Sequence, residues 1–218
     1  MKSAICSIHS RLLIPDFLSN VEISNSDIWG KEITFVKDEY HLISAVSGAG
    51  KSSLLSYLFG ERSDYAGEII FNDRIIDSFK SAEWSDIRQN RISFVFQGLR
   101  LFPELTAFEN ICLKNQLTSH KSDDEILFML ETAGLAGKCN EKAVRLSFGQ
   151  QQRIAIIRAL CQPFDFLFLD EPFSHLDDDN IGIMANMITK EVKSKQAGLL
   201  LCSLGVEYPF GYHKKWKL

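Results

Sequence analysis

The chain has 218 residues, of which 45% are hydrophobic and 24% charged, a composition typical of one globular domain with a sizeable core. Its 24 basic and 28 acidic residues give a net charge of −4, so the basic excess of a general nucleic-acid-binding protein is missing. Five scattered cysteines indicate reduced intracellular thiols rather than a disulfide framework or a zinc site. Neither a signal peptide nor an apolar run of about 20 residues is present, so any membrane role requires a partner.

The first half of the chain predicts short strands around a glycine-rich loop. Residues 1–40 indicate short strands with polar turns. The apolar run 41–46 predicts a buried strand, which the glycine-rich loop and then a helix over about 54–60 follow. Residues 68–76 predict a hairpin, because the Asn-Asp pair at their centre tolerates positive φ. Another buried strand is expected over 91–96.

The second half predicts helices and buried strands in alternation. From residue 97 to about 146 the pattern is helical, and Ser122 with Glu125 can form a capping box. A helix, a strand, a second helix and a last buried strand then follow over 149–161, 166–169, 180–195 and 199–203. This order predicts a largely parallel sheet that helices cover.

The loop after the first buried strand fits a phosphate-binding loop. Small residues let several backbone N–H groups point at one phosphate chain beside a helix N-terminus. Lys51 would reach the β and γ phosphates, and the Ser52 hydroxyl would bind Mg²⁺. Ala45 stands at the first glycine position, a one-methyl difference that we expect nucleotide binding to survive. A chance glycine turn is the alternative; the predicted binding residues are Ser47, Gly48, Ala49, Gly50, Lys51, Ser52 and Ser53.

An acidic pair follows the buried strand over 166–169. Asp170 is the predicted metal ligand, and Glu171 is the predicted general base toward an attacking water. Taken alone, such a pair is more often a solvated turn. Downstream of a phosphate-binding loop, the functional interpretation is favoured.

The sequence LSFGQQQR at 146–153 makes the interpretation more specific, because it resembles the signature of ATP-binding subunits of ABC transporters. The order of motifs also resembles that family, with Gln97 as the Q-loop residue and a D-loop over 174–177. The resemblance spans roughly residues 30–205. It implies ATP and Mg²⁺ as ligands, with Gln97 near the metal or the attacking water.

In that family two cassettes pack head to tail, and each ATP lies between one phosphate-binding loop and the partner's signature. The resemblance therefore implies a homodimer, or a pair with a related ATPase subunit, in which Ser147, Gly149, Gln150 and Asp177 complete the partner's site. Ser147 and the Gly149 amide precede a helix and would offer hydrogen-bond donors to the γ-phosphate. Loss of that phosphate would remove the bridge and open the dimer.

The resemblance also implies a fold and a cellular role. The fold is an α/β P-loop NTPase of the ABC type, with a RecA-like parallel-sheet core, an N-terminal antiparallel β region and an inserted helical subdomain. We expect a single domain over 1–218, divided into 1–97, 98–146 and 147–218. The chain would hydrolyse ATP for a separate membrane permease, and it would lie in the cytoplasm on the inner face of the membrane.

Residues 98–111 resemble the family surface that receives a coupling helix of the permease, although Phe102, Leu105 and Phe108 fit a local core equally well. Within the family, the Gln97–Ile111 stretch and the short chain resemble ATPases of lipoprotein release and macrolide export. This substrate class rests on analogy. A chromosome-maintenance or translation ATPase is disfavoured, because a long coiled-coil insertion or a second head would be expected. Nucleic acid is not an expected partner.

Two residues depart from the family pattern. Phe148 replaces the first glycine of the signature, and Leu204 stands where the family has a switch histidine. Leucine cannot hydrogen-bond a phosphate, so an ATP-gated regulatory or assembly module with slow or no hydrolysis is the alternative function. His175 fits a D-loop packing residue better than a replacement for that histidine. The aromatic residue that stacks on adenine stays open among Phe17, Trp29 and Tyr40.

Overall fold

The computed structural model describes residues 6–13 and 26–218, which form two sheets with helices around them. The smaller sheet is antiparallel, with its strands in the order β2-β1-β4-β5. Its strands are β1 (Ser7–Leu12), β2 (Glu32–Val36), β4 (Gly67–Phe71) and β5 (Arg74–Ile75). The predicted hairpin is confirmed, because β4 and β5 pair through Asn72 and Asp73, whose φ angles are 47° and 65°. These left-handed conformations suit a tight two-residue hairpin turn.

The larger sheet is parallel throughout and has the order β6-β7-β8-β3-β9. Its strands are β3 (Tyr40–Ser44), β6 (Ile92–Val95), β7 (Phe166–Asp170), β8 (Gly198–Ser203) and β9 (Lys214–Lys217). The carboxyl ends of parallel strands meet at one edge of the sheet, which in open α/β folds is the edge that binds ligands. The loops after β3, β6, β7 and β8 therefore converge there.

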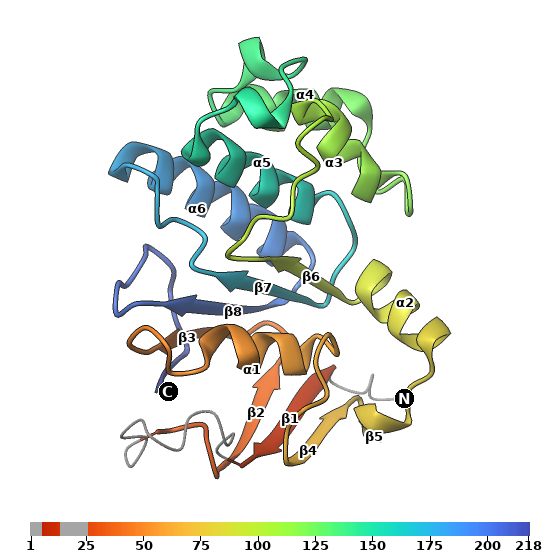
Figure 1. The fold of residues 1–218 in the computed structure, drawn as a ribbon, viewed down its shortest axis with the longest axis vertical. Coiled ribbons are helices and arrows are strands. Elements are labelled where there is room, and N and C mark those ends of the chain that lie inside the picture. Colours follow the sequence, from red (N-terminus) through yellow and green to blue (C-terminus); the bar gives the residue numbers. More distant parts are fainter. Residues whose placement is uncertain (1–5, 14–25) are drawn as a thin grey trace.

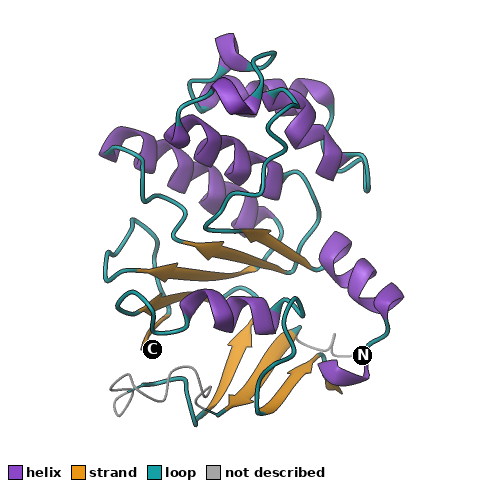
Figure 2. Cartoon of the chain, viewed as in Figure 1, coloured by secondary structure: helices purple, strands orange, loops and turns teal. Residues whose placement is uncertain are grey.

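Helices cover the parallel sheet on both faces, as Figure 1 shows, with α1 between the two sheets and α5 and α6 on the opposite face. The α3–α4 pair lies farthest from the antiparallel sheet, beyond α5 (Figure 2). The helices are α1 (Lys51–Leu58), α2 (Ser81–Asn90), α3 (Ala107–Asn115), α4 (Asp123–Thr132), α5 (Phe148–Leu160) and α6 (Asp178–Ser194). Short 3-10 turns occur at Ile76–Ser78, Ala136–Lys138 and Ala143–Arg145. Among these described helices, none has the length and apolar character that a membrane span requires.

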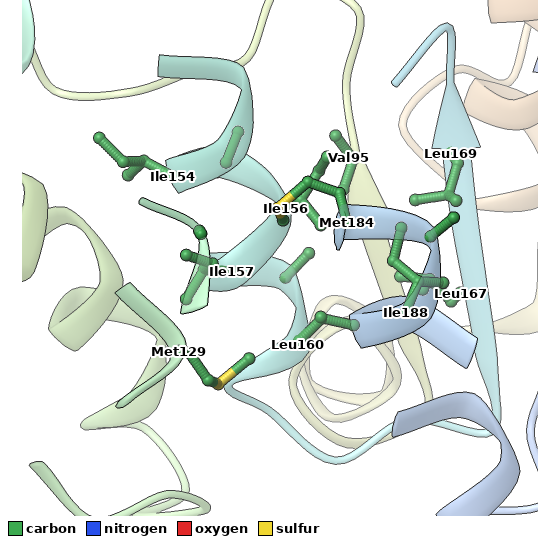
Figure 3. Packing of buried hydrophobic residues seen from close by; sticks show 14 of the residues in the cluster. Val95, Met129, Ile154, Ile156, Ile157, Leu160, Leu167, Leu169, Met184 and Ile188 are labelled. Atoms are coloured by element: carbon green, nitrogen blue, oxygen red, sulfur yellow. The ribbon is translucent and has the colours of Figure 1, made fainter. Parts of the chain in front are cut away.

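The core has two parts because alternate side chains of each strand point to opposite faces of the sheet. Phe166 and Phe168 of β7 pack with α1 and the antiparallel sheet, whereas Leu167 and Leu169 face α5 and α6. Figure 3 shows the second part, where Ile156 and Leu160 of α5 lie near Met184 and Ile188 of α6 and the leucines of β7. All of these side chains are buried. The strand that carries Asp170 is thus fixed on both sides.

Several elements differ from the sequence prediction. The strand over 199–203 is not the last one, because β9 adds an edge strand beside β3. Helix α2 was not anticipated; its mean composition is polar and Ile87 is its one fully buried residue. Helices α5 and α6 begin at 148 and 178 rather than at 149 and 180. The region 97–146 is helical only in α3, α4 and two 3-10 turns.

Candidate functional site

The phosphate-binding loop connects the carboxyl end of β3 to the first turn of α1. Gly48 and Gly50 have φ angles of 82° and 93°, which glycine adopts without a steric penalty. Ala49 is buried, and its carbonyl accepts a hydrogen bond from the Trp29 indole at 3.4 Å. Gly50 is the N-cap of α1, so the N–H groups of the first turn are left for an anion rather than for a capping side chain.

The charged end of Lys51 lies over this loop. Its ammonium donates to the carbonyls of Ala45 and Val46, each at 3.1 Å, and the side chain is nearly buried. A buried cation beside a helix N-terminus concentrates positive potential at one point. Ser47 and Gly48 are exposed on the same loop. The Ser53 hydroxyl faces away to accept a hydrogen bond from Arg62 at 2.9 Å.

Both predicted carboxylates lie at the end of β7. Asp170 is the last residue of the strand, and Glu171 follows it with a φ of 50°, a conformation that is strained for a side chain of this size. Glu171 Oε1 lies 3.6 Å from Lys51 Nζ. Strand β7 thereby brings its carboxylates to the phosphate-binding loop. Asp170 is buried and the Glu171 side chain is 11% exposed, so the pair is not a freely solvated turn.

The residues at this point fit a magnesium ion. Asp170 is buried, and its Oδ1 makes no hydrogen bond with any residue that the structure describes. Burial raises the pKa of Asp170, while the nearby Ser52 hydroxyl and Lys51 ammonium act in the opposite direction. Within the described ranges, no cluster of three or more His, Cys, Asp or Glu side chains could hold a metal. One carboxylate and one hydroxyl are what Mg²⁺ takes from a protein when phosphates and waters supply its other ligands.

Gln97 lies in the turn that follows the neighbouring strand β6. Val95 of β6 pairs with Leu169 of β7, so the residues that follow the two strands leave the sheet side by side. Gln97 is exposed. The next turn is unusual, because Leu99 and Arg100 are both left-handed, with φ of 54° and 50°. The Arg158 guanidinium donates to the carbonyls of Leu99 and Arg100 at 2.6 and 2.7 Å.

The signature begins helix α5 with a capping box. The Ser147 hydroxyl accepts from the Gln150 N–H at 3.3 Å, and Gln150 Oε1 accepts from the Ser147 N–H at 2.9 Å. A serine hydroxyl that accepts one hydrogen bond still has its own hydrogen to donate. Ser147 is the N-cap, whereas Gly149 lies inside the first turn and not before the helix as predicted.

The signature packs against the D-loop of the same chain. The Phe148 ring is 44% exposed and meets the His175 ring edge-on at 4.3 Å. A Cβ on Gly149 would lie 2.8 Å from the His175 carbonyl oxygen. His175 therefore packs on the signature, as favoured above. Asp177 caps α6 by accepting from the Asn180 N–H at 2.9 Å.

Gln152 joins these motifs and was not among the predicted site residues. Its buried side chain donates to the Glu171 carbonyl at 3.2 Å and to Ser174 Oγ at 3.1 Å. Its Oε1 accepts from the His175 N–H at 3.2 Å. A signal was present, because Gln152 stands three and four residues before Ala155 and Ile156, which places it on an apolar helix face.

The structure places Leu204, which departs from the family pattern, and two of the aromatic candidates for stacking on adenine. Leu204 follows β8 and is 52% exposed. Trp29 and Tyr40 are buried, so neither offers an exposed ring on which adenine could stack. Phe17 lies outside the described residues.

Comparison with known proteins gives consistent matches. A family model described as "ABC transporter" matches residues 30–174. The chain is 30% identical over 191 residues to "Putative hemin import ATP-binding protein HrtA" of Staphylococcus aureus strains MRSA252 and Newman, which covers 85% of this chain and 86% of each relative.

Two solved structures of the cassette MJ0796 also match. The dimeric post-hydrolysis state bound to ADP and Pi superposes with a TM-score of 0.72 and 27% identity, covering 80% of this chain and 78% of that one. The structure described as "Dimeric Structure of MJ0796, a Bacterial ABC Transporter Cassette" gives 0.77 and 25%, covering 90% and 88%. The extent of the family match and the arrangement of the motifs lead to one conclusion: the chain belongs to the ABC transporter family, as an ATP-binding cassette.

Proposed function

We propose that this cassette hydrolyses ATP through Lys51, Ser52, Asp170 and Glu171. The observation that carries the proposal is the approach of Glu171 to Lys51 at 3.6 Å, beside a buried Asp170 oxygen that has no hydrogen-bond partner in the part of the chain that the structure describes. Lys51 would hold the β and γ phosphates, and Ser52, Asp170 and Gln97 would hold Mg²⁺. The ion, when bound, neutralises charge that develops on the phosphate oxygens.

Glu171 is suited to the role of general base. Its carboxylate is mostly enclosed, and its left-handed backbone directs the side chain toward the phosphate-binding loop rather than along the strand. A carboxylate at that position accepts a proton from water as the water attacks the γ-phosphate. The Gln152 hydrogen bond to the Glu171 carbonyl holds this backbone in place.

The same geometry supports a head-to-tail dimer. Ser147 stands at the N-terminus of a 13-residue helix with a hydroxyl hydrogen to donate, which suits the γ-phosphate of an ATP bound to a partner. The solved MJ0796 relatives are dimeric. Gly149, Gln150 and Asp177 would lie at the same face, with Gln150 and Asp177 mainly as helix caps.

Phosphate release from the purified chain tests this proposal. Glu171→Gln should lower ATP turnover by about 10²–10⁴-fold, because a positioned base contributes that much. The same variant should accumulate an ATP-dependent dimer in analytical ultracentrifugation. Glu104→Gln, at an exposed side chain, is the matched control and should behave as the parent. Unchanged turnover in Glu171→Gln would exclude Glu171 as the base.

Leu204 supports the second candidate, an ATP-gated module with slow hydrolysis. This exposed leucine offers no hydrogen bond to a phosphate, and Phe148 places an exposed ring at the signature. Parent chain that dimerises with ATP but releases negligible phosphate would favour this candidate. Leu204→His should then increase phosphate release. If the parent hydrolyses ATP as fast as Leu204→His, the slow-hydrolysis candidate is excluded.

A permease would dock on an aromatic groove near Gln97. A cavity of about 330 Å³ there is lined by Phe59, Phe94, Phe96, Phe102, Leu113, Lys114, Arg158 and Ala159. Phe102 is 57% exposed and lines the groove, which supports the docking role for this residue. Phe108 instead packs against the main core, and Leu105 is half-buried outside the groove lining. Such a groove suits the apolar face of a short helix. A permease bound there would hold the cassette at the inner face of a membrane.

The transported substrate is proposed only as a class. Resemblance to ATPases of lipoprotein release and macrolide export indicates export of lipoproteins or small hydrophobic compounds, and the curated relatives are named for hemin. We propose a hydrophobic cargo. Transport of labelled lipoprotein, macrolide and hemin by membranes that contain the cassette and its permease tests this class, and transport of none of them would contradict it.

A further inference from the structure

The aromatic groove contains cationic side chains that form no ion pair with a carboxylate among the described residues. Lys114 and Arg158 line the groove, and the Arg88 guanidinium lies over the ring of Phe59, which also lines it. All three side chains end on backbone carbonyls. Lys114 donates to the Arg88 carbonyl at 3.2 Å, Arg158 to Leu99 and Arg100, and Arg88 to Phe59 and Gly60.

The neighbouring cation at the rim behaves differently. Arg100 forms an ion pair with Glu61 at 2.5 Å and lies over the Phe96 ring. Among residues 6–13 and 26–218, no such pair is made by Arg88, Lys114 or Arg158. Burial, with the charges of Arg158 and Arg88, lowers the pKa of Lys114. Burial also lowers the pKa of Arg158 to about 10, so Arg158 remains charged at neutral pH.

Lys114 and Arg158 repel each other in an apolar groove, which is electrostatically unfavourable. An anion that binds between them would relieve this repulsion. Covering the groove would desolvate Lys114 and Arg158 further, and a buried charge without a partner is strongly unfavourable. An entirely apolar segment would therefore dock at a penalty. A segment with one carboxylate would supply these cations with a partner, which offsets their desolvation and favours this segment over an uncharged one.

We propose that the membrane-protein segment that docks in this groove is an amphipathic helix that places a carboxylate between Lys114 and Arg158. Its apolar side chains contact the phenylalanines of the groove. This inference rests on the proposed function for the docking itself and adds the chemistry of the partner. The carboxylate would also contact the residue that holds the turn after Gln97, since Arg158 binds both Leu99 and Arg100.

Photo-crosslinking from the groove tests the inference. The photoreactive amino acid benzoylphenylalanine replaces Phe102 in the full chain, which is expressed in the organism that naturally produces it. The matched control replaces Phe128, which is 63% exposed on α4 and lines a different groove. We expect Phe102 alone to crosslink to a polytopic membrane protein, with Asp or Glu within one helical turn of the crosslinked residue.

Charge exchange then tests the pairing directly. Lys114→Glu should reduce the crosslink yield at least tenfold, Lys114→Gln should reduce it less, and Lys190→Glu at the other groove should leave it unchanged. Replacing the identified carboxylate with Lys should restore the yield of Lys114→Glu. Retained ATP binding by every variant excludes misfolding.

The possible results distinguish the acidic pairing from the docking site on which it rests. A crosslinked membrane segment without a nearby carboxylate, or a yield indifferent to Lys114→Glu, overturns the acidic pairing and leaves the docking site intact. Crosslinks from Phe102 to lipid alone, or to no membrane protein, overturn the docking site on which the pairing rests.

Discussion

Gly149 is a residue that cannot be replaced without a structural shift, for purely steric reasons. Its missing side chain lets the first turn of α5 approach the backbone of the D-loop at His175, where the Phe148 and His175 rings also meet. A glycine inside a helix is ordinarily unfavourable by roughly 0.5–1 kcal/mol relative to alanine. Here the close approach explains the glycine.

We expect Gly149→Ala to destabilise the protein by about 1–3 kcal/mol, because the new methyl group overlaps the His175 carbonyl and the helix must shift. Urea unfolding measures this change. Gly182→Ala is the control, since that helical glycine has open space around it, and it should stabilise by roughly 0.5–1 kcal/mol. Equal midpoints for Gly149→Ala and the parent would show that the contact is unimportant.

Asp170 shows that the site is kept at the expense of stability. Because burial raises its pKa, its charged form opposes folding above the carboxyl pKa of the unfolded chain, and the penalty disappears as the pH falls through the folded pKa. Asp170→Asn should therefore unfold at higher urea than the parent at pH 7, with Mg²⁺-dependent turnover lost. The stability gain should vanish in acid. A variant less stable than the parent at pH 7 would contradict this account.

At the scale of elements, one buried side chain ties α5 to the loops after β7. Gln152 satisfies polar groups of Glu171, Ser174 and His175, so the signature helix and the backbone of Glu171, the proposed base, share a hydrogen-bonded network. Such a network is stabilising only while every member has its partner.

Gln152→Leu should leave these polar groups unpaired and destabilise the protein by about 1–3 kcal/mol. It should also lower ATP turnover, since the Glu171 carbonyl loses its donor. Thermal unfolding and phosphate release measure the two effects. Gln116→Leu, at an exposed glutamine after α3, should be nearly neutral. Parent-like stability in Gln152→Leu would show that water replaces the side chain.

Some elements were predictable because their information is local. The buried apolar run of β7 and the glycine-rich loop before α1 each place their polar residues, Asp170 and Lys51, at strand and helix ends. Strand β9 was missed because its Lys-Lys-Trp-Lys sequence is typical of a solvated tail; it pairs with β3 as an exposed edge, where charges are common. Gln152 was missed because its partners are distant in sequence.

At the scale of the whole molecule, one buried histidine links acidity to stability. His41 lies on β3 between β8 and β9, fully buried, and its Nδ1 accepts from the Trp216 indole at 3.2 Å. Burial lowers the pKa of His41 to about 4, against about 6.5 when unfolded. The unfolded chain thus binds the proton first.

The free energy of unfolding should consequently decrease by up to about 3 kcal/mol as the pH falls from 6.5 to about 4. Urea titrations at successive pH values measure the slope. His41→Gln keeps an acceptor for Trp216 and cannot titrate, so its slope should be smaller. It should not reach zero, because burial also lowers the pKa of His120. Identical slopes in parent and variant would exclude His41 as the source.

Helix α5 connects the signature to the turn that follows Gln97, two places that lie far apart in the sequence. Ser147 begins the helix, and Arg158 near its end grips the left-handed turn that follows Gln97. At 1.5 Å per residue these positions are about 16 Å apart, and the helix between them is packed on both β6 and α3. We therefore expect the helix to move as one rigid element, so that a force applied at Arg158 is transmitted to Ser147.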